Sequence, residues 1–296
     1  MTINVKDGGT FREVNQVYVH DGTSFTNKTI TNAYVKDGGV WREIFTLFNT
    51  TAFSQTTGSV TVPTNANAFH IRFAVGGGSG GVGGAEYDKA GGESAGAGGA
   101  SGAYISDKVF TVTSGETLNI ATGSAGSGTS GGYNTTAGNG GNTTITSSSS
   151  GINITLQGGI GGNGNSGGVQ GPLRNNVAST GGAASISGTV LSSGTSVDGL
   201  DITSFTSGPV GTFNQSGNGV AGQNPGNCGG DNCQIQGGQG GASYGGAHPG
   251  PSGAPAGGSD SNGTRGAGGG GGGAQPQSAG VPGGAGEIEY RFLRIV

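Results

Sequence analysis

The chain has 296 residues, 72 of them glycine, and a formal net charge of −4 from 12 Lys and Arg against 16 Asp and Glu. Such sparse, mildly acidic charge offers no basic surface for nucleic acid or for an anionic membrane. No apolar run reaches the length of a membrane span, so we expect a protein that binds no nucleic acid and does not insert into a membrane.

Three related segments open the chain, each with an Asp-Gly pair between short β-prone runs. Their aspartates are Asp7, Asp21 and Asp37, so the unit repeats after 14 and 16 residues. An Asp-Gly pair flanked by hydrophobic residues is a strong β-hairpin signal. We therefore predict a β-meander of short hairpins over residues 1–46 and interpret its aspartates as turn residues.

Two segments far apart in the sequence show the period-2 alternation of a half-buried strand. Apolar residues alternate with His70 and Arg72 in the first, and with Glu287 and Glu289 in the second. We expect these strands to pair, because pairing places opposite charges side by side. The alternation slips at Leu293, which predicts a β-bulge near the C-terminal end of the second strand.

Between these strands lies a tract with 66 of the 72 glycines, from Gly76 to Gly286. The glycines come in blocks without the every-third register of collagen, which favours packed polyglycine-II helices with three residues per turn. N–H···O bonds and Cα–H···O contacts would offset the high cost of ordering glycine. Islands rich in Thr, Ile and Val predict strands within the tract at residues 103–112, 117–122, 142–146, 152–156, 186–191 and 200–205.

The predicted fold class is all-β with essentially no α-helix, in two domains. Residues 1–46 form the N-terminal β-hairpin repeat. Residues 47–296 form a glycine-rich domain with a β-sandwich-like sheet, in which strands 50–75 and 287–296 close a glycine-rich body over 76–286.

No set of catalytic residues emerges, so we predict no enzyme and no cofactor. Residues 76–81 fit the G-x-G-x-x-G spelling of a dinucleotide site, but more glycine follows instead of the helix that such a site requires. Cys228 and Cys233 form either a disulfide or two free thiols. Two cysteines cannot complete a four-ligand zinc site, and we predict no metal.

Three motifs of the tract resemble the glycine-rich domain of tailed-bacteriophage tail-fibre proteins over about residues 50–296. They are Phe73-Ala-Val-Gly-Gly-Gly, then Val109-Phe-Thr-Val-Thr-Ser-Gly-Glu-Thr-Leu-Asn-Ile, and a closing Gly283-Gly-Ala-Gly-Glu-Ile-Glu-Tyr. The N-terminal segment 34–44 is similar to short repeats found in phage tail components.

The resemblance implies a virion protein of the phage tail. It implies a receptor-binding adhesin at a fibre tip or tail tip, which displays loops toward a protein or glycan receptor on the host cell. The N-terminal region would attach to other tail or fibre proteins, in a homotrimer or as one copy on a trimeric fibre. The alternative is a purely structural virion protein, such as a fibre cap, a decoration protein or a tail component, without receptor contact.

Rare aromatic residues among small ones mark candidate binding positions, because they give contact area at low entropy cost. By this argument the candidate receptor-binding residues are Tyr87, Tyr133, Tyr244 and His248. Packing of the tyrosines between glycine helices is the alternative explanation.

Overall fold

A computed structural model describes the chain in parts. The described residues are 53–64, 66–83, 96–130, 135–161, 182–191, 266 and 279–294, together with the backbone of 4–7, 10–13, 18–20, 25–27, 32–37, 40–46, 193–194, 205–206 and 210–211. Throughout this part the regular structure is β-strand, and no α-helix occurs in it. The predicted all-β fold is confirmed.

The N-terminal region contains three antiparallel hairpins. They are β1 (Asn4–Asp7) with β2 (Thr10–Glu13), β3 (Tyr18–His20) with β4 (Phe25–Asn27), and β5 (Asn32–Asp37) with β6 (Val40–Thr46). Asp7 pairs with Thr10, and Asp37 pairs with Val40. The first and third hairpins therefore reverse between Asp7 and Thr10 and between Asp37 and Val40, directly after the aspartates where the sequence predicts a turn.

Two antiparallel sheets follow, with the strand orders β14-β9-β8-β18 and β13-β12-β11-β10-β7. Their strands are β7 (Gly58–Thr61), β8 (Ala68–Val75), β9 (Tyr104–Thr111), β10 (Thr117–Ala121), β11 (Thr143–Ser147), β12 (Asn153–Leu156), β13 (Ala184–Ser187), β14 (Val190–Leu191) and β18 (Glu287–Leu293). Short strands add to them: β15 (Ser193–Gly194) pairs with β16 (Phe205–Thr206), and β17 (Val210–Gly211) pairs with β9.

One hydrophobic core joins the two sheets. Phe69 and Tyr290 of the first sheet and Leu118, Ile145 and Ile154 of the second sheet belong to the same buried cluster. Apolar residues alternate along the strands of the second sheet with Ser, Thr and Asn, which is typical of a sandwich with one solvated face.

The predicted pairing of β8 with β18 is confirmed, but the bulge lies elsewhere. The register shifts between Glu289 and Tyr290, where Arg72 is the extra residue of β8. Side chains change faces there, so Ala74 lies in the core. The prediction of a bulge near Leu293 was wrong, because Leu293 continues the ladder opposite Ala68. The real bulge cannot be recognised in the sequence, because its extra residue, Arg72, continues the polar–apolar alternation of β8.

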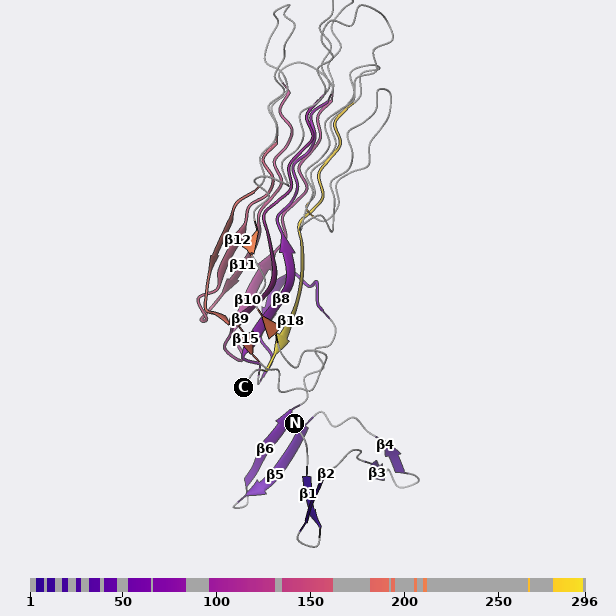
Figure 1. Cartoon of the computed structure of the whole chain (residues 1–296), viewed down its shortest axis with the longest axis vertical. Coiled ribbons are helices and arrows are strands. Elements are labelled where there is room, and N and C mark those ends of the chain that lie inside the picture. The colour runs from indigo at the N-terminus through magenta and orange to yellow at the C-terminus, as the bar shows by residue number, and fades with distance from the viewer. Residues whose placement is uncertain are drawn as a thin grey trace, which may run out of the picture.

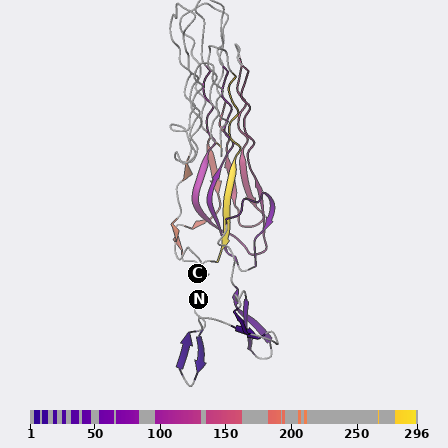
Figure 2. The same cartoon turned by 90° about the vertical axis from the view of Figure 1, so that its right-hand side faces the viewer.

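Six strands continue without a turn into glycine-rich segments that run side by side (Figures 1 and 2). We call these segments, together with Gly266, the glycine bundle. The segments are 76–83 after β8, 96–103 before β9, 122–130 after β10, 135–142 before β11, 157–161 after β12 and 279–286 before β18.

Residues 76–83, the central segment, bond to the other segments with a period of three. Residues 76, 79 and 82 donate to segment 96–103, residues 77 and 80 to segment 135–142, and residues 78 and 81 to segment 279–286. These seven N···O distances are 2.8 to 3.0 Å. Only a helix with three residues per turn returns its N–H groups to the same neighbour in this way.

The carbonyls of the central segment complete a ring of six neighbours. Gly78 accepts from segment 122–130, and Gly77 accepts from segment 157–161. Gly266 lies in the sixth position, because its N–H donates to Ala285, its carbonyl accepts from Gly102, and a Cβ added to it would lie 2.4 Å from the carbonyl oxygen of Gly76, the central segment's first residue. The predicted polyglycine-II packing is confirmed.

Glycine is required at many of the positions where two segments touch. A Cβ added to Gly77 or Gly80 would lie 2.0 Å from a carbonyl oxygen of segment 122–130. Contacts between backbone and an added Cβ below 3 Å recur at every third residue of 96–103 and 279–286, namely at Gly96, Gly99, Gly102, Gly280, Gly283 and Gly286. The tract therefore does contain an every-third register, confined to single segments.

We predict that Gly80→Ala lowers the free energy of unfolding by more than about 3 kcal/mol, because the methyl group must displace the backbone of Ser127. Gly115→Ala is the matched control, since Gly115 has a φ of +81° but nothing within 4 Å of an added Cβ. It should cost only about 1 kcal/mol, the penalty of a left-handed conformation. Urea unfolding measures both, and equal costs would contradict the packing argument.

Candidate functional site

The residues that the sequence singles out as sites lie outside the described part of the chain. They are the candidate binding residues Tyr87, Tyr133, Tyr244 and His248 and the cysteines Cys228 and Cys233. What the structure provides is the place where the chain leaves the glycine bundle and returns to it.

The central segment and segments 96–103, 122–130, 135–142 and 279–286 all end on the side of the bundle far from the sheets (Figure 1). Val82 donates its N–H to the carbonyl of Ala97 at 2.8 Å. Thr129 accepts the N–H of Gly280 on its carbonyl and the N–H of Gly83 on its side-chain Oγ1, at 2.9 Å in each case. The last N–H of the central segment is thus satisfied by a threonine hydroxyl.

Two connections of the chain start and finish at this end of the bundle. Residues 84–95 join the central segment to segment 96–103, and residues 131–134 join segment 122–130 to segment 135–142. These connections contain Tyr87 and Tyr133. The chain path therefore assigns both tyrosines to connections at the same end of the bundle.

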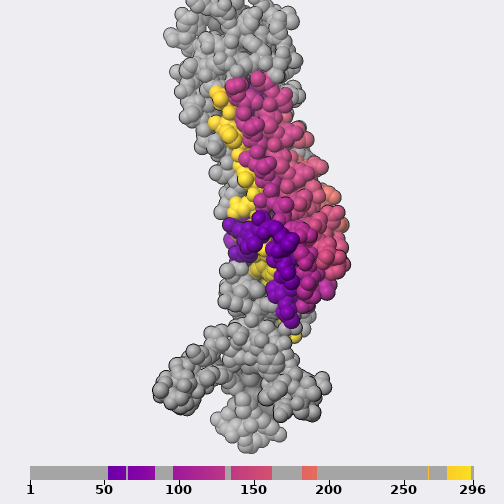
Figure 3. All heavy atoms as spheres, turned by 180° about the vertical axis from the view of Figure 1, so that it is seen from behind, coloured from indigo at the N-terminus to yellow at the C-terminus, as the bar shows by residue number. Residues whose placement is uncertain are grey.

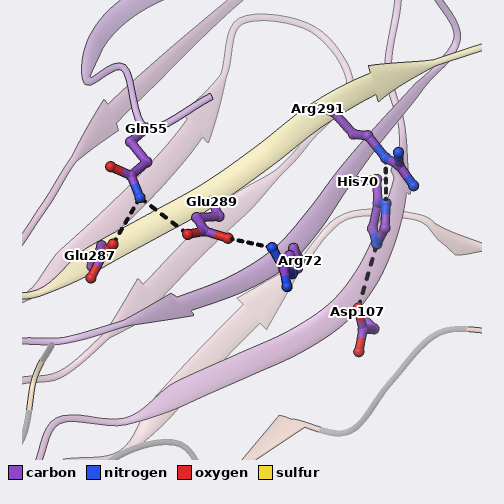
Figure 4. A network of polar contacts seen from close by, with 7 residues as sticks. All are labelled: Gln55, His70, Arg72, Asp107, Glu287, Glu289 and Arg291. Atoms are coloured by element: carbon purple, nitrogen blue, oxygen red, sulfur yellow. Dashed lines mark hydrogen bonds and ion pairs between the residues drawn. The ribbon is translucent and has the colours of Figure 1, made fainter. Parts of the chain in front are cut away.

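A second candidate site is a polar cluster on the first sheet, where Ser54 forms an antiparallel bridge with Tyr290 of β18. Figure 3 shows indigo residues of the first part of the body lying against the yellow C-terminal residues. Ser54 and Tyr290 exchange two backbone hydrogen bonds of 2.7 and 3.0 Å. Gln55 donates through Nε2 to Glu287 at 2.9 Å and to Glu289 at 3.1 Å, as Figure 4 shows. Segment 53–57 is thereby fixed to the edge strand.

Phe53 anchors this segment among positive charges. The guanidinium of Arg291 lies 4.6 Å and that of Arg72 5.2 Å from the centre of the Phe53 ring, and His70 meets the ring edge-on at 5.6 Å. Each cation–π contact contributes on the order of 0.5–1 kcal/mol or more. Nothing in the sequence distinguishes Phe53 from its neighbours, so the sequence did not reveal this role.

The sequence predicted that His70 and Arg72 lie beside Glu287 and Glu289. The prediction is confirmed for Arg72 and is wrong for His70. Arg72 Nη1 lies 3.1 Å from Glu289 Oε2, an ion pair across β8 and β18. His70 meets neither glutamate: its Nδ1 accepts a hydrogen bond of 3.2 Å from Nε of Arg291 (Figure 4). The bulge at Arg72 shifts the register, so the partner of His70 in the ladder is Arg291.

His70 is a neutral imidazole in the folded protein. Burial, with the nearby charges of Arg291 and Arg72, lowers its pKa from 6.5 to about 4. Because Nδ1 accepts from Arg291, the proton lies on Nε2, which is 3.7 Å from Oδ1 of Asp107. Burial raises the pKa of Asp107, and the charge of Arg72 opposes that rise.

We interpret this polar cluster as an anchor for segment 53–57. Among the described residues, no group of three or more His, Cys, Asp or Glu side chains could hold a metal ion. The described chain also has no helix long and apolar enough to cross a membrane. The contacts of the cluster all connect segment 53–57, β8, β9 and β18 to one another.

We predict that stability falls by about 3 kcal/mol as the pH is lowered from 6.5 to 4 on account of His70 alone. As the pH falls from 6.5 the unfolded chain protonates the imidazole, while the folded protein keeps it neutral until the pH nears its pKa of about 4, so the unfolded state binds more protons. Urea unfolding at a series of pH values measures the slope.

His70→Gln is the control for this pH dependence, because its amide oxygen can still accept from Arg291 but does not titrate. The variant should lose the His70 part of the slope. An unchanged slope, or an NMR titration of His70 in the folded protein near pH 6.5, would contradict the assignment.

Comparison with known proteins places the body of the chain in a family. A family model described as a glycine-rich domain matches residues 51–293, which span both sheets and the glycine bundle. The comparison with curated proteins returns no match. Because the model covers well over half of the 296 residues, the chain belongs to the family of proteins that carry this glycine-rich domain.

Proposed function

We propose that this chain is a tail-fibre or tail-tip protein of a tailed bacteriophage and that it binds a receptor on the host cell surface. The observation that carries the proposal is that segments of the glycine bundle end together on the side far from the sheets, where the chain leaves the bundle for residues 84–95 and 131–134 and returns to it. A binding site at the end of a stiff projection suits a protein that must reach a cell surface. The resemblance of the glycine-rich motifs and of segment 34–44 to phage tail proteins supports the same function.

The bundle is suited to hold binding segments away from the sheets. Eight residues of the central segment extend about 25 Å at 3.1 Å per residue. The segment is buried along its whole length and hydrogen-bonded on all sides. Such a rod keeps its far end in a fixed position relative to the sheets.

Specificity in this proposal comes from the connections and not from the sides of the bundle. The six segments contain no Asp, Glu, Lys or Arg, and their outward side chains are mostly Ser, Ala, Thr and Asn. Tyr87 and Tyr133 are the aromatic residues of the two connections, and they are the proposed contacts for the receptor. Tyr244 and His248 are proposed contacts on the sequence argument alone.

The remaining parts of the proposal concern assembly. The hairpins of residues 1–46 attach the chain to other tail or fibre proteins of the virion. The protein works as a homotrimer or as one copy on a trimeric fibre. The receptor is a protein or glycan of the host surface.

The purified full-length chain, added to host cells before infection, should bind the cells and reduce phage adsorption. Tyr87→Ala and Tyr133→Ala should each weaken cell binding about tenfold, the effect of removing an aromatic contact worth more than 1 kcal/mol. Ser185→Ala, on the exposed face of β13, is the matched control and should bind as the original chain does.

An antibody against the full chain should label the tail in electron micrographs of the phage. If the tail is labelled but the protein neither binds cells nor reduces adsorption, the chain is a structural virion protein and the adhesin proposal fails. If the tail is not labelled, the location in the tail is wrong.

A further inference from the structure

Segment 53–57 is the first part of the body that the chain reaches after the N-terminal hairpins. Residues 47–52 separate it from β6, the last hairpin strand, and β7 of the second sheet begins directly after it. Besides the bonds of Ser54 and Gln55 to β18, the carbonyl of Thr56 accepts a hydrogen bond of 3.2 Å from the hydroxyl of Tyr290. These contacts determine where the chain enters the body.

The segment takes no part in the hydrophobic core between the sheets. Phe53 is half-buried and lies outside the core cluster, and residues 55–57 are exposed. The side chains that surround Phe53 include His70 and Arg291, which alternate with core residues along β8 and β18 and so lie on the other face of the first sheet. Segment 53–57 can therefore leave β18 without opening the core.

The hydrogen bond between His70 and Arg291 requires a neutral imidazole. Nδ1 of His70 accepts from Nε of Arg291 at 3.2 Å, and a guanidinium has donors only. An imidazolium carries a hydrogen on both nitrogens, so protonation of His70 would set a donor against a donor at this distance. One of the two side chains must then move.

Phe53 packs on the side chains that this movement displaces. Its ring centre lies 4.6 Å from the guanidinium of Arg291, 5.2 Å from that of Arg72 and 5.6 Å from the centre of the His70 ring. Protonation of His70 adds a third positive charge around this one ring, and like charges repel. A shift of Arg291 or His70 thus removes part of the surface that holds Phe53.

The acidic groups near His70 compensate a positive charge on it only weakly. On β18, Glu289 pairs with Arg72, and both Glu289 and Glu287 accept from Gln55 (Figure 4). On β9, Asp107 lies 3.7 Å from Nε2 of His70. Burial raises the pKa of Asp107, with Arg72 opposing that rise, so its negative charge weakens as the pH falls.

We propose that His70 is a pH-dependent switch for segment 53–57: when the imidazole binds a proton, the segment leaves β18 while the two sheets stay folded. This local opening frees the imidazole at the least cost, because it spares the core. It also lengthens the link between β6 and the body from residues 47–52 to residues 47–57. The maximal reach of that link rises from about 20 to about 37 Å.

Linkage gives the size of the effect. The closed form, with segment 53–57 in place, has a His70 pKa of about 4, while a free imidazole has a pKa of 6.5. Between these values the open form binds more protons, so the preference for the closed form is greatest above pH 6.5 and is lost as the pH falls to 4. Over this range the ratio of open to closed molecules rises about 80-fold.

The test is amide hydrogen exchange in the full chain, followed by NMR at pH 6.5 and at pH 4. The probes are the N–H groups of Ser54 and Tyr290, which bond segment 53–57 to β18, and the reference is the set of bonded amides of β11 and β12. Relative to His70→Gln at the same two pH values, protection of both probes should fall about 80-fold further in the original chain. The reference amides should remain more protected than the probes at pH 4.

His70→Gln keeps an acceptor for Arg291 but does not titrate, and comparison at equal pH cancels the intrinsic pH dependence of exchange. Phe53→Leu is the second variant: it should lower the protection of both probes about tenfold already at pH 6.5, because two cation–π contacts are lost. Circular dichroism establishes that each variant is folded.

Two results would overturn the proposal. One is an equal loss of probe protection in the original chain and in His70→Gln, which would assign the pH dependence to the carboxylates. The other is exchange of the probes only together with the amides of β11 and β12, which would mean that the segment is released by global unfolding. This second comparison needs the original chain alone, so it decides even if His70→Gln fails to fold. Neither result bears on receptor binding, so the proposed function stands or fails separately.

Discussion

The body of this protein depends on a backbone contact that leaves no room for a side chain. Each segment of the glycine bundle approaches its neighbours so closely that an added Cβ would collide with a carbonyl group, as at Gly77 and Gly80. In return the central segment satisfies its N–H groups at 2.8 to 3.0 Å in three directions. Hydrogen bonds between neighbouring segments, perpendicular to the segment axes, hold the bundle together. An ordinary domain relies on buried apolar side chains instead.

The sandwich of two sheets supplies the hydrophobic core that the glycine bundle lacks. Side chains such as Phe69 and Leu118 fill the space between the two sheets, which pack face to face at about 10 Å in sandwiches. Beyond Val75 and Ala121 glycine replaces most of the large side chains and the two layers come into direct contact, so that Gly77 of one layer donates to Gly141 of the other. The hydrophobic core thereby fixes the register in which the glycine segments meet. Thr143 lies at the junction, where its hydroxyl bonds the backbone of both layers.

The local sequence pattern predicted the strands and the polyglycine-II segments well, but it predicted the contacts between distant residues less well. The β-prone islands and the partnership of β8 with β18 follow from residue types and period-2 alternation, and polyglycine-II follows from blocks of glycine. The bulge at Arg72 did not emerge, because an extra polar residue between apolar ones leaves the alternation intact. Phe53 did not emerge as an anchor either, since its partners Arg72 and Arg291 are distant in sequence. The proposed contacts Tyr87 and Tyr133 came from composition, and only the chain path assigns both to connections at one end of the bundle.

The period of three has a consequence for how such a rod can vary among relatives. Insertion of one or two residues into a single segment rotates every later group away from its acceptor and brings side chains such as Val82 or Ala97 onto backbone contacts. Inserting three residues in one segment alone preserves the rotation but leaves that segment a turn longer than its partners. The bundle can therefore grow or shrink only if all neighbouring segments gain or lose the same number of whole turns. Its length changes in steps of about 9 Å, the rise of one three-residue turn.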